Sequence, residues 1–140
     1  MFLFKFINNK SITKSYYYYS IKIFNWGADM KFEDSTQGKV AIFDISGKIM
    51  GGSETTLFHG RVRELINLNK KNVILDLSRV EWMNSIGIGM LISAMVTVKN
   101  SGGRLVLANI DKIENILIMT RLITVFEHFD TREEALKSLS

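Results

Sequence analysis

The chain has 140 residues, of which 46% are apolar and 23% are charged, the usual balance for a globular protein with one domain. It has no cysteine, which excludes disulfides, thiolate-bound zinc and thiol catalysis, and its two histidines (His59 and His128) leave little material for a metal centre. The net charge is +4, but residues 1–29 supply +3 of it (four lysines against one aspartate), so the basic footprint of a nucleic-acid binder is not expected in the rest of the chain.

Residues 1–29 differ from the rest of the chain. They hold nine of its fifteen aromatic residues, including four successive tyrosines, and show no helical or alternating apolar period. Lysines and asparagines interrupt the only stretch that resembles a secretory signal. We expect a disordered extension, or upstream sequence read as coding from the wrong start, with a membrane-touching aromatic tail as the alternative. The domain itself is expected over residues 30–140.

Strands are expected at the start of this domain. Residues 39–46 form a β-rich run between two glycines, and residues 48–50 continue it after a glycine bend. Residues 31–35 are expected to pair with this run. A turn should follow at Gly51 and Gly52.

Helices and strands then alternate, which favours an α/β layered domain with parallel strand pairs. Every expected element is marked by a local signal, such as an N-cap, an apolar face or a glycine stop. The first helix is capped by Ser53, runs to about residue 68 and has an apolar face of Phe58, Val62, Leu65 and Ile66. A strand at 72–77, a short turn that holds Trp82 and Met83, and an apolar helix at 85–99 follow. The remaining elements are a strand at 104–110, a helix capped by Asp111 that runs to about 119, a weak strand at 125–129 and a last helix with a Thr131–Glu134 capping box.

The clearest chemical pattern is a buried strand followed by a helix start. Asn84 is a good N-cap, which places Ser85 in the first helical turn, where backbone N–H groups lack partners. These donors and the helix dipole favour negative charge, so a phosphoryl group on Ser85 would be stabilised by its own helix. Gly87 and Gly89 remove two side chains from the next turn at a cost of roughly 1 kcal/mol each, which points either to close packing or to contact with a partner. Asp76, in the strand, has no acidic companions nearby in the sequence and is expected to set the turn rather than to do chemistry.

The residues Leu75-Asp76-Leu77-Ser78 and Met83-Asn84-Ser85-Ile86-Gly87-Ile88-Gly89 resemble the hallmark of STAS domains, in particular the single-domain anti-sigma factor antagonists of bacteria. The similarity continues through Gly102-Gly103-Arg104-Leu105 and Leu122-Ile123-Thr124-Val125-Phe126 and covers residues 30–140. It implies a single α/β STAS domain with a mixed, mostly parallel β-sheet and helices packed against it.

The resemblance also implies a function. The serine at position 85 would be the phosphoacceptor of an anti-sigma factor, a histidine-kinase-like serine kinase, which the unphosphorylated chain binds and thereby frees the sigma factor. A serine phosphatase is a candidate second partner, and the cytoplasm is the expected location. No cofactor, metal, nucleic acid or membrane is expected at the site. The expected partner-binding residues are Met50, Gly51, Gly52, Ser53, Asn84, Ser85, Ile86, Gly87, Ile88 and Gly89.

The chain departs from the family pattern in ways that leave alternatives open. Asn84 replaces the usual aspartate, Ile86 replaces a serine or threonine, and residues 47–50 lack an acidic residue often found there. Phosphorylation would then change the local charge at the site sharply, from about neutral to negative. Alternatively, the chain would lack a carboxylate needed for efficient transfer and would be a permanently active binder. A non-switching STAS scaffold or transport-system subunit is the alternative function. An enzyme is not expected, because the chain has no P-loop and Met83 stands where a hydrolase elbow needs glycine.

Overall fold

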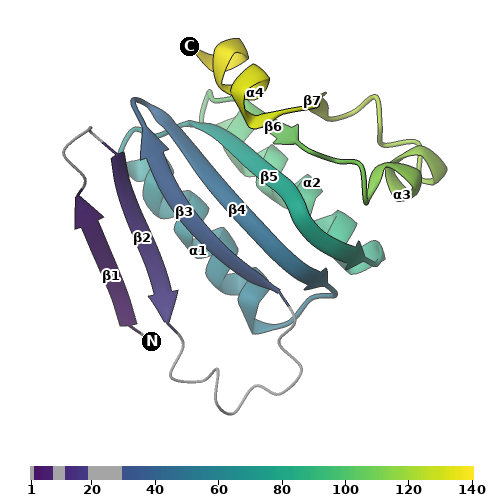
Figure 1. The fold of residues 1–140 in the computed structure, drawn as a ribbon, viewed down its shortest axis with the longest axis horizontal. Coiled ribbons are helices and arrows are strands. Elements are labelled where there is room, and N and C mark those ends of the chain that lie inside the picture. Colours follow the sequence, from purple (N-terminus) through teal and green to yellow (C-terminus); the bar gives the residue numbers. More distant parts are fainter. Residues whose placement is uncertain (1, 8–11, 19–29) are drawn as a thin grey trace.

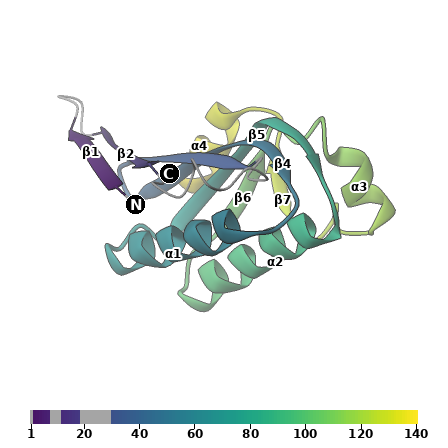
Figure 2. The same cartoon turned by 90° about the horizontal axis from the view of Figure 1, so that it is seen from below.

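A computed structural model describes residues 2–7, 12–18 and 30–140, and the side chains of residues 30–140. Its described strands form one sheet, with α1 (Ser53–Asn67) and α2 (Ser85–Asn100) side by side on one face and α4 (Arg132–Leu139) on the other (Figures 1 and 2). The short helix α3 (Glu114–Met119) lies beyond the end of the sheet. This is the layered α/β arrangement that the alternation of elements predicted.

The sheet is mixed. Its strands follow one another in sequence order, antiparallel from β1 to β4 and parallel from β4 to β7. Within residues 30–140 only the first pair is antiparallel, which confirms the predicted mixed, mostly parallel sheet. The strands are β1 (Phe2–Ile7), β2 (Ile12–Tyr18), β3 (Lys31–Gln37), β4 (Val40–Ile49), β5 (Asn72–Met83), β6 (Leu105–Ala108) and β7 (Glu127–Phe129).

The strands β1 and β2 fall within residues 1–29, where no strand was predicted. They pair with each other, and β2 pairs with β3 from Ile12 opposite Gln37 to Tyr16 opposite Glu33. The rest of this segment (1, 8–11 and 19–29) lies outside the described residues. The interpretations of residues 1–29 as an extension or as misread upstream sequence, and the domain boundary at residue 30, stay predictions.

The larger core lies between the sheet and helices α1 and α2. Phe58 of α1 is fully buried, and its ring centroid lies 5.7 Å from that of Phe32 and 5.1 Å from that of Phe43, both nearly edge-on. Such pairs favour one packing arrangement of the helix on the strands. Of the four residues predicted on the apolar face of α1, Ile66 alone is only partly buried. A smaller core under α4 joins Val40, Ile42, Ile74, Val106, Ala108 and Ala135.

Two predicted helix caps were wrong. Gly52, not Ser53, is the N-cap of α1, and its φ of +114° is a conformation that glycine adopts without strain. Ser53 is the first helical residue, and its hydroxyl donates to the Glu54 carboxylate. Helix α3 begins at Glu114 rather than just after Asp111, because a turn closed by the Ile113 N–H on the Ile110 carbonyl comes first.

The predicted turn after residue 77 was also wrong, because β5 continues to Met83. The reason lies in β4, which runs on past Gly47 through two register shifts. Its last residues, Lys48 and Ile49, pair with Trp82 and Met83, so the backbone there stays extended. Met83 is buried in the core, whereas Trp82 is half exposed.

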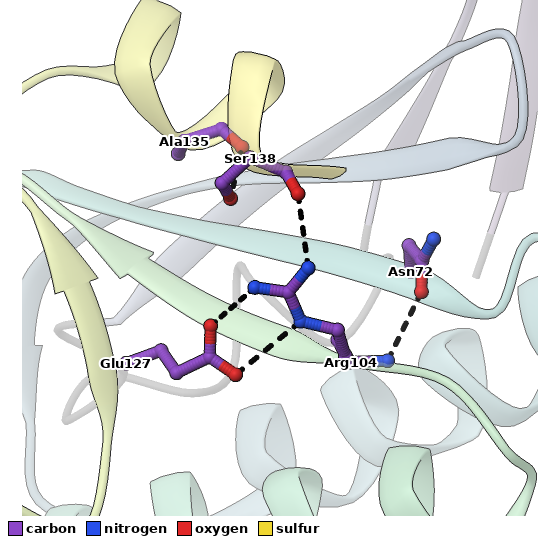
Figure 3. A network of polar contacts seen from close by, with 5 residues as sticks. All are labelled: Asn72, Arg104, Glu127, Ala135 and Ser138. Atoms are coloured by element: carbon purple, nitrogen blue, oxygen red, sulfur yellow. Dashed lines mark hydrogen bonds and ion pairs between the residues drawn. The ribbon is translucent and has the colours of Figure 1, made fainter. Parts of the chain in front are cut away.

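Arg104, directly before β6, ties the C-terminal elements together (Figure 3). The Arg104 guanidinium binds the Glu127 carboxylate of β7 through two nitrogens and donates to the Ser138 carbonyl of α4 at 2.9 Å. Its backbone N–H donates to the Asn72 side chain of β5 at 3.0 Å. The Arg104 side chain is 46% exposed, so its ion pair with Glu127 adds little stability. Its contact with α4 is the bond to the Ser138 carbonyl.

Candidate functional site

The start of α2 is joined to the end of β4 by its cap. The Asn84 N–H donates to the Ile49 carbonyl at 3.2 Å, and the Asn84 side-chain oxygen accepts from the Gly87 N–H at 3.0 Å. Asn84 is therefore the N-cap that the sequence predicted. Since β4 and β5 end at the same edge of the sheet (Figure 1), Ser85 lies at that edge.

The two glycines of the motif have different surroundings. A Cβ atom on Gly87 would lie 2.6 Å from the Ile49 carbonyl oxygen and 3.0 Å from the Met83 Cβ, so no side chain fits there. Gly89 is exposed, and a Cβ atom on it would meet nothing within 4 Å. Packing accounts for Gly87, and it does not account for Gly89.

The turn between β4 and α1 lies against α2. A Cβ atom on Gly51 would lie 2.8 Å from the Cγ2 atom of Ile86, and the φ of +95° at Gly51 favours glycine as well. The structure thus brings together the two segments that the sequence proposed as one surface. We call Met50–Ser53 and Asn84–Gly89 the loop–helix surface.

The residues of the loop–helix surface are not equally accessible. Ser85 and Ile86 are exposed, as are Gly52, Ser53 and Gly89, while Met50, Gly51 and Asn84 are half-buried. Gly87 and Ile88 are buried and support the surface from below. The first turn of α2 contains no acidic residue, so no carboxylate of that turn competes with an anion at Ser85.

A second polar group lies under α4. The Asp76 carboxylate is almost fully buried and accepts from the Ser78 N–H, the Asn109 side chain and the Arg132 guanidinium, at 3.0, 3.0 and 2.9 Å. Arg132 also forms an ion pair with Asp44, which lies beside Asp76 on β4. We call Asp44, Asp76, Asn109 and Arg132 the Arg132 cluster.

The Arg132 cluster changes two predictions about Asp76. Asp76 does not set a turn, since β5 continues past it to Met83, and it has an acidic neighbour, because the register places Asp44 beside it. Its carboxylate accepts the Ser78 N–H within the strand. Burial alone would raise the pKa of Asp76, but the bonds from Ser78, Asn109 and Arg132 outweigh burial and hold that pKa below its usual value. The group is thus an ionised internal contact. Arg132 could not be recognised from the sequence, since only the fold brings it to the two strands.

The remaining titratable groups form no obvious reactive centre. Among the residues whose side chains are described, no three histidine, aspartate or glutamate residues gather closely enough to hold a metal. Half-burial and the nearby Arg63 charge lower the pKa of His59, which keeps its imidazole neutral. Within the described residues no helix is long and apolar enough to cross a bilayer.

The fold and this motif coincide with one protein family. The family model for the STAS domain matches residues 31–135. The chain belongs to the STAS domain family. The resemblance seen in the Asn84–Gly89 motif is therefore confirmed.

Similar proteins fall into two kinds. A Thermotoga maritima protein named "Putative anti-sigma factor antagonist" is 29% identical over 77 residues, which cover 54% of this chain and 68% of the relative. The structure of the Bacillus anti-sigma factor antagonist SpoIIAA in its unphosphorylated form matches with a TM-score of 0.64 at 17% identity, over 76% of this chain and 94% of SpoIIAA. A sulfate transporter family protein from Wolinella succinogenes matches with a TM-score of 0.60 at 20% identity, over 74% of this chain and 87% of that one. At these identities the two structures show a shared fold.

Proposed function

We propose that this STAS domain is an anti-sigma factor antagonist that works by partner switching. With Ser85 unphosphorylated it binds an anti-sigma factor that is a serine kinase, and the sigma factor is freed. Phosphorylation of Ser85 by that kinase releases the domain, and a serine phosphatase resets it. The domain acts by binding rather than by catalysis, in the cytoplasm, and its effect is on transcription.

The observation that carries the proposal is the position of Ser85. Its side chain is exposed at the first residue of a 16-residue helix whose first turn has no carboxylate. The dipole of that helix stabilises a phosphoryl group at this position. The same group adds a charge of about −1.5 to −2 to a surface whose own residues are glycines, serines, one asparagine and apolar side chains, without a charged residue. A partner that has desolvated this surface would be repelled.

The similar proteins support the same function. The relative from Thermotoga carries the name of an antagonist, and SpoIIAA has been solved in both an unphosphorylated and a phosphorylated form. The fold of this chain resembles both forms of SpoIIAA, with TM-scores of 0.64 and 0.62. A phosphate is thus compatible with this fold in a related domain.

The test measures binding of the full chain to purified histidine-kinase-like anti-sigma factors of the organism of origin, with ADP or with ATP. Wild type should bind with ADP and dissociate with ATP. Ser85→Ala should bind with both nucleotides, and Ser85→Asp should bind weakly with both, although aspartate carries only about one charge. Ser93→Ala, at another exposed serine of α2, is the matched control and should behave as wild type. Identical ATP responses of wild type and Ser85→Ala would exclude Ser85 as the switch.

Asn84 allows a finer test of the transfer step. An aspartate at this position would keep the N-cap, because its carboxylate can accept the same bond from Gly87. Asn84→Asp should therefore fold normally, and it should speed phosphorylation of Ser85 if the missing carboxylate limits transfer. An unchanged rate would show that the kinase needs no carboxylate from this chain.

The alternative function is a non-switching STAS scaffold or a subunit of a transport system. The similarity to a sulfate transporter family protein and the departures at Asn84 and Ile86 favour it. This function predicts a partner whose binding is independent of ATP and of Ser85.

A further inference from the structure

Ile86 is the most exposed large apolar side chain of α2, with 59% of its surface accessible. It follows Ser85 directly, at a position where the family pattern has a hydroxyl residue. An isoleucine exposed to water adds no stability to the domain. The buried face of the helix is already formed by Ile88, Met90 and Leu91. The residue therefore has no evident role in the isolated domain.

Ile86 is nevertheless held in place. Its Cγ2 atom packs on Gly51, so closely that a Cβ atom on that glycine would lie 2.8 Å away. The positive φ of Gly51 gives the loop the shape that makes this contact possible. A β-branched side chain in a helix also has one strongly preferred rotamer. The exposed part of Ile86 is thus already ordered, and docking it into a partner costs little conformational entropy.

Ser85 and Ile86 are both exposed in the first turn of α2, and Ile86 packs on Gly51 of the same loop–helix surface. A protein that docks over this surface to reach the Ser85 hydroxyl therefore covers Ile86 as well. A kinase site that closes around Ser85 therefore removes Ile86 from water. A polar surface on the kinase would lose its own hydration against this side chain without gaining a hydrogen bond, whereas an apolar socket would gain from the contact.

We infer that Ile86 is a specificity-determining residue, an apolar anchor that fits an apolar socket beside the serine-binding site of the anti-sigma factor. The inference rests on the proposed function and adds which partner is chosen. A kinase with this socket binds the present chain in preference to antagonists that carry serine or threonine at the same position, since those leave the socket unfilled.

The closing experiment uses Ile86→Thr, because threonine keeps the branched Cβ and a γ-methyl group for Gly51 and replaces the outer ethyl group by a hydroxyl. Binding of the full chain is measured with ADP to purified histidine-kinase-like anti-sigma factors of the organism of origin, tested one at a time. Ile86→Thr should weaken binding by roughly tenfold or more, the worth of a buried aliphatic group. Ile86→Val, which loses one methyl group, should weaken it by about threefold.

The matched control is Val96→Thr, which makes a similar change at a side chain that is 46% exposed further along α2. It should bind within about twofold of wild type, because it lies nearly three turns from Ser85. If wild type binds and responds to ATP while Ile86→Thr binds equally well, the anchor is disproved and the proposed function stands. If wild type binds none of these kinases, the proposed function itself fails. Equal losses in Ile86→Thr and Val96→Thr would also overturn the anchor, since the effect would then not be local.

Discussion

The loop–helix surface and the Arg132 cluster use their polar groups in opposite ways. In the Arg132 cluster each oxygen of Asp76 accepts a bond from within the chain, and a partly buried ion pair results. On the loop–helix surface Asn84 is engaged in the cap and the Ser53 hydroxyl donates to Glu54, while Ser85 and Ile86 are exposed to solvent. The charges of the Arg132 cluster thus pair within the chain, whereas the loop–helix surface, the proposed binding surface, is only weakly polar.

The largest effect on stability is expected from a substitution of Asp76, the central residue of the Arg132 cluster. Asp76→Asn removes the charge and turns an amide nitrogen toward one of the present donors. The free energy of unfolding should fall by roughly 2–3 kcal/mol, the usual contribution of hydrogen bonds to a buried charged group. Binding to the anti-sigma factor should stay unchanged. Chemical denaturation and a binding titration check both, and lost binding at full stability would show that the Arg132 cluster belongs to the site.

A somewhat smaller effect separates the two glycines. Gly87→Ala should destabilise the domain by about 1–3 kcal/mol, because the new methyl group meets the Ile49 carbonyl. Gly89→Ala has free space and should stabilise α2 by up to about 1 kcal/mol. Thermal unfolding measures both. If Gly89→Ala weakens partner binding in spite of its gain in stability, Gly89 lies in the interface, and if binding is unchanged, Gly89 lies outside it.

Acid should weaken the Arg132 cluster before it affects the loop–helix surface. The pKa of Asp76 is lower in the folded chain than its usual value of 3.8, so between these two values the unfolded chain binds more protons. The stability that Asp76 contributes is therefore present above pH 4 and lost as the pH falls through the folded pKa. Denaturation between pH 6 and pH 3 should show this loss for wild type and a smaller one for Asp76→Asn. If the free energy of unfolding falls equally with pH in wild type and in Asp76→Asn, Asp76 is not the cause of the loss.

The smallest effect is expected from removal of residues 1–29, because both regions of the comparison lie in residues 30–140. A chain that begins at Met30 should keep the thermal midpoint and the far-UV spectrum of the full chain. A midpoint lower by several degrees would mean that β2 stabilises β3, with which it pairs, and would move the domain boundary toward the N-terminus.

Sequence signals predicted what is decided locally. The cap at Asn84, the cap at Thr131 with its bond from the Glu134 N–H, and the apolar face of α1 all depend on residues within one or two helical turns. The serine at the start of α2 was found in the same way, and its role as a phosphoacceptor, implied by the family resemblance, stays a prediction. These features need no knowledge of which strands are neighbours.

Apart from the wrong caps at Ser53 and Asp111, the features that the sequence did not reveal depend on distant pairing. The extension of β5 to Met83 needs β4 beside it, and the ion pair of Arg132 with Asp44 joins residues 88 positions apart. The contact between Gly51 and Ile86 likewise joins a loop to the first turn of α2, which only the parallel pairing of β4 and β5 brings together. The periodicity of apolar residues cannot reveal such contacts, because it describes one helix or strand at a time.

The bond from the Asn84 N–H to the Ile49 carbonyl has a kinetic consequence. It links the end of β4, which leads into Met50–Ser53, to the start of α2. The packing of Ile49 against Gly87 stabilises the same arrangement. The surface therefore needs no rearrangement before a partner can dock. Association should then follow a single step whose rate rises in proportion to partner concentration, with a rate constant of roughly 10⁵–10⁷ M⁻¹s⁻¹, and changes at Ser85 or Ile86 should appear mainly in how long the complex lasts.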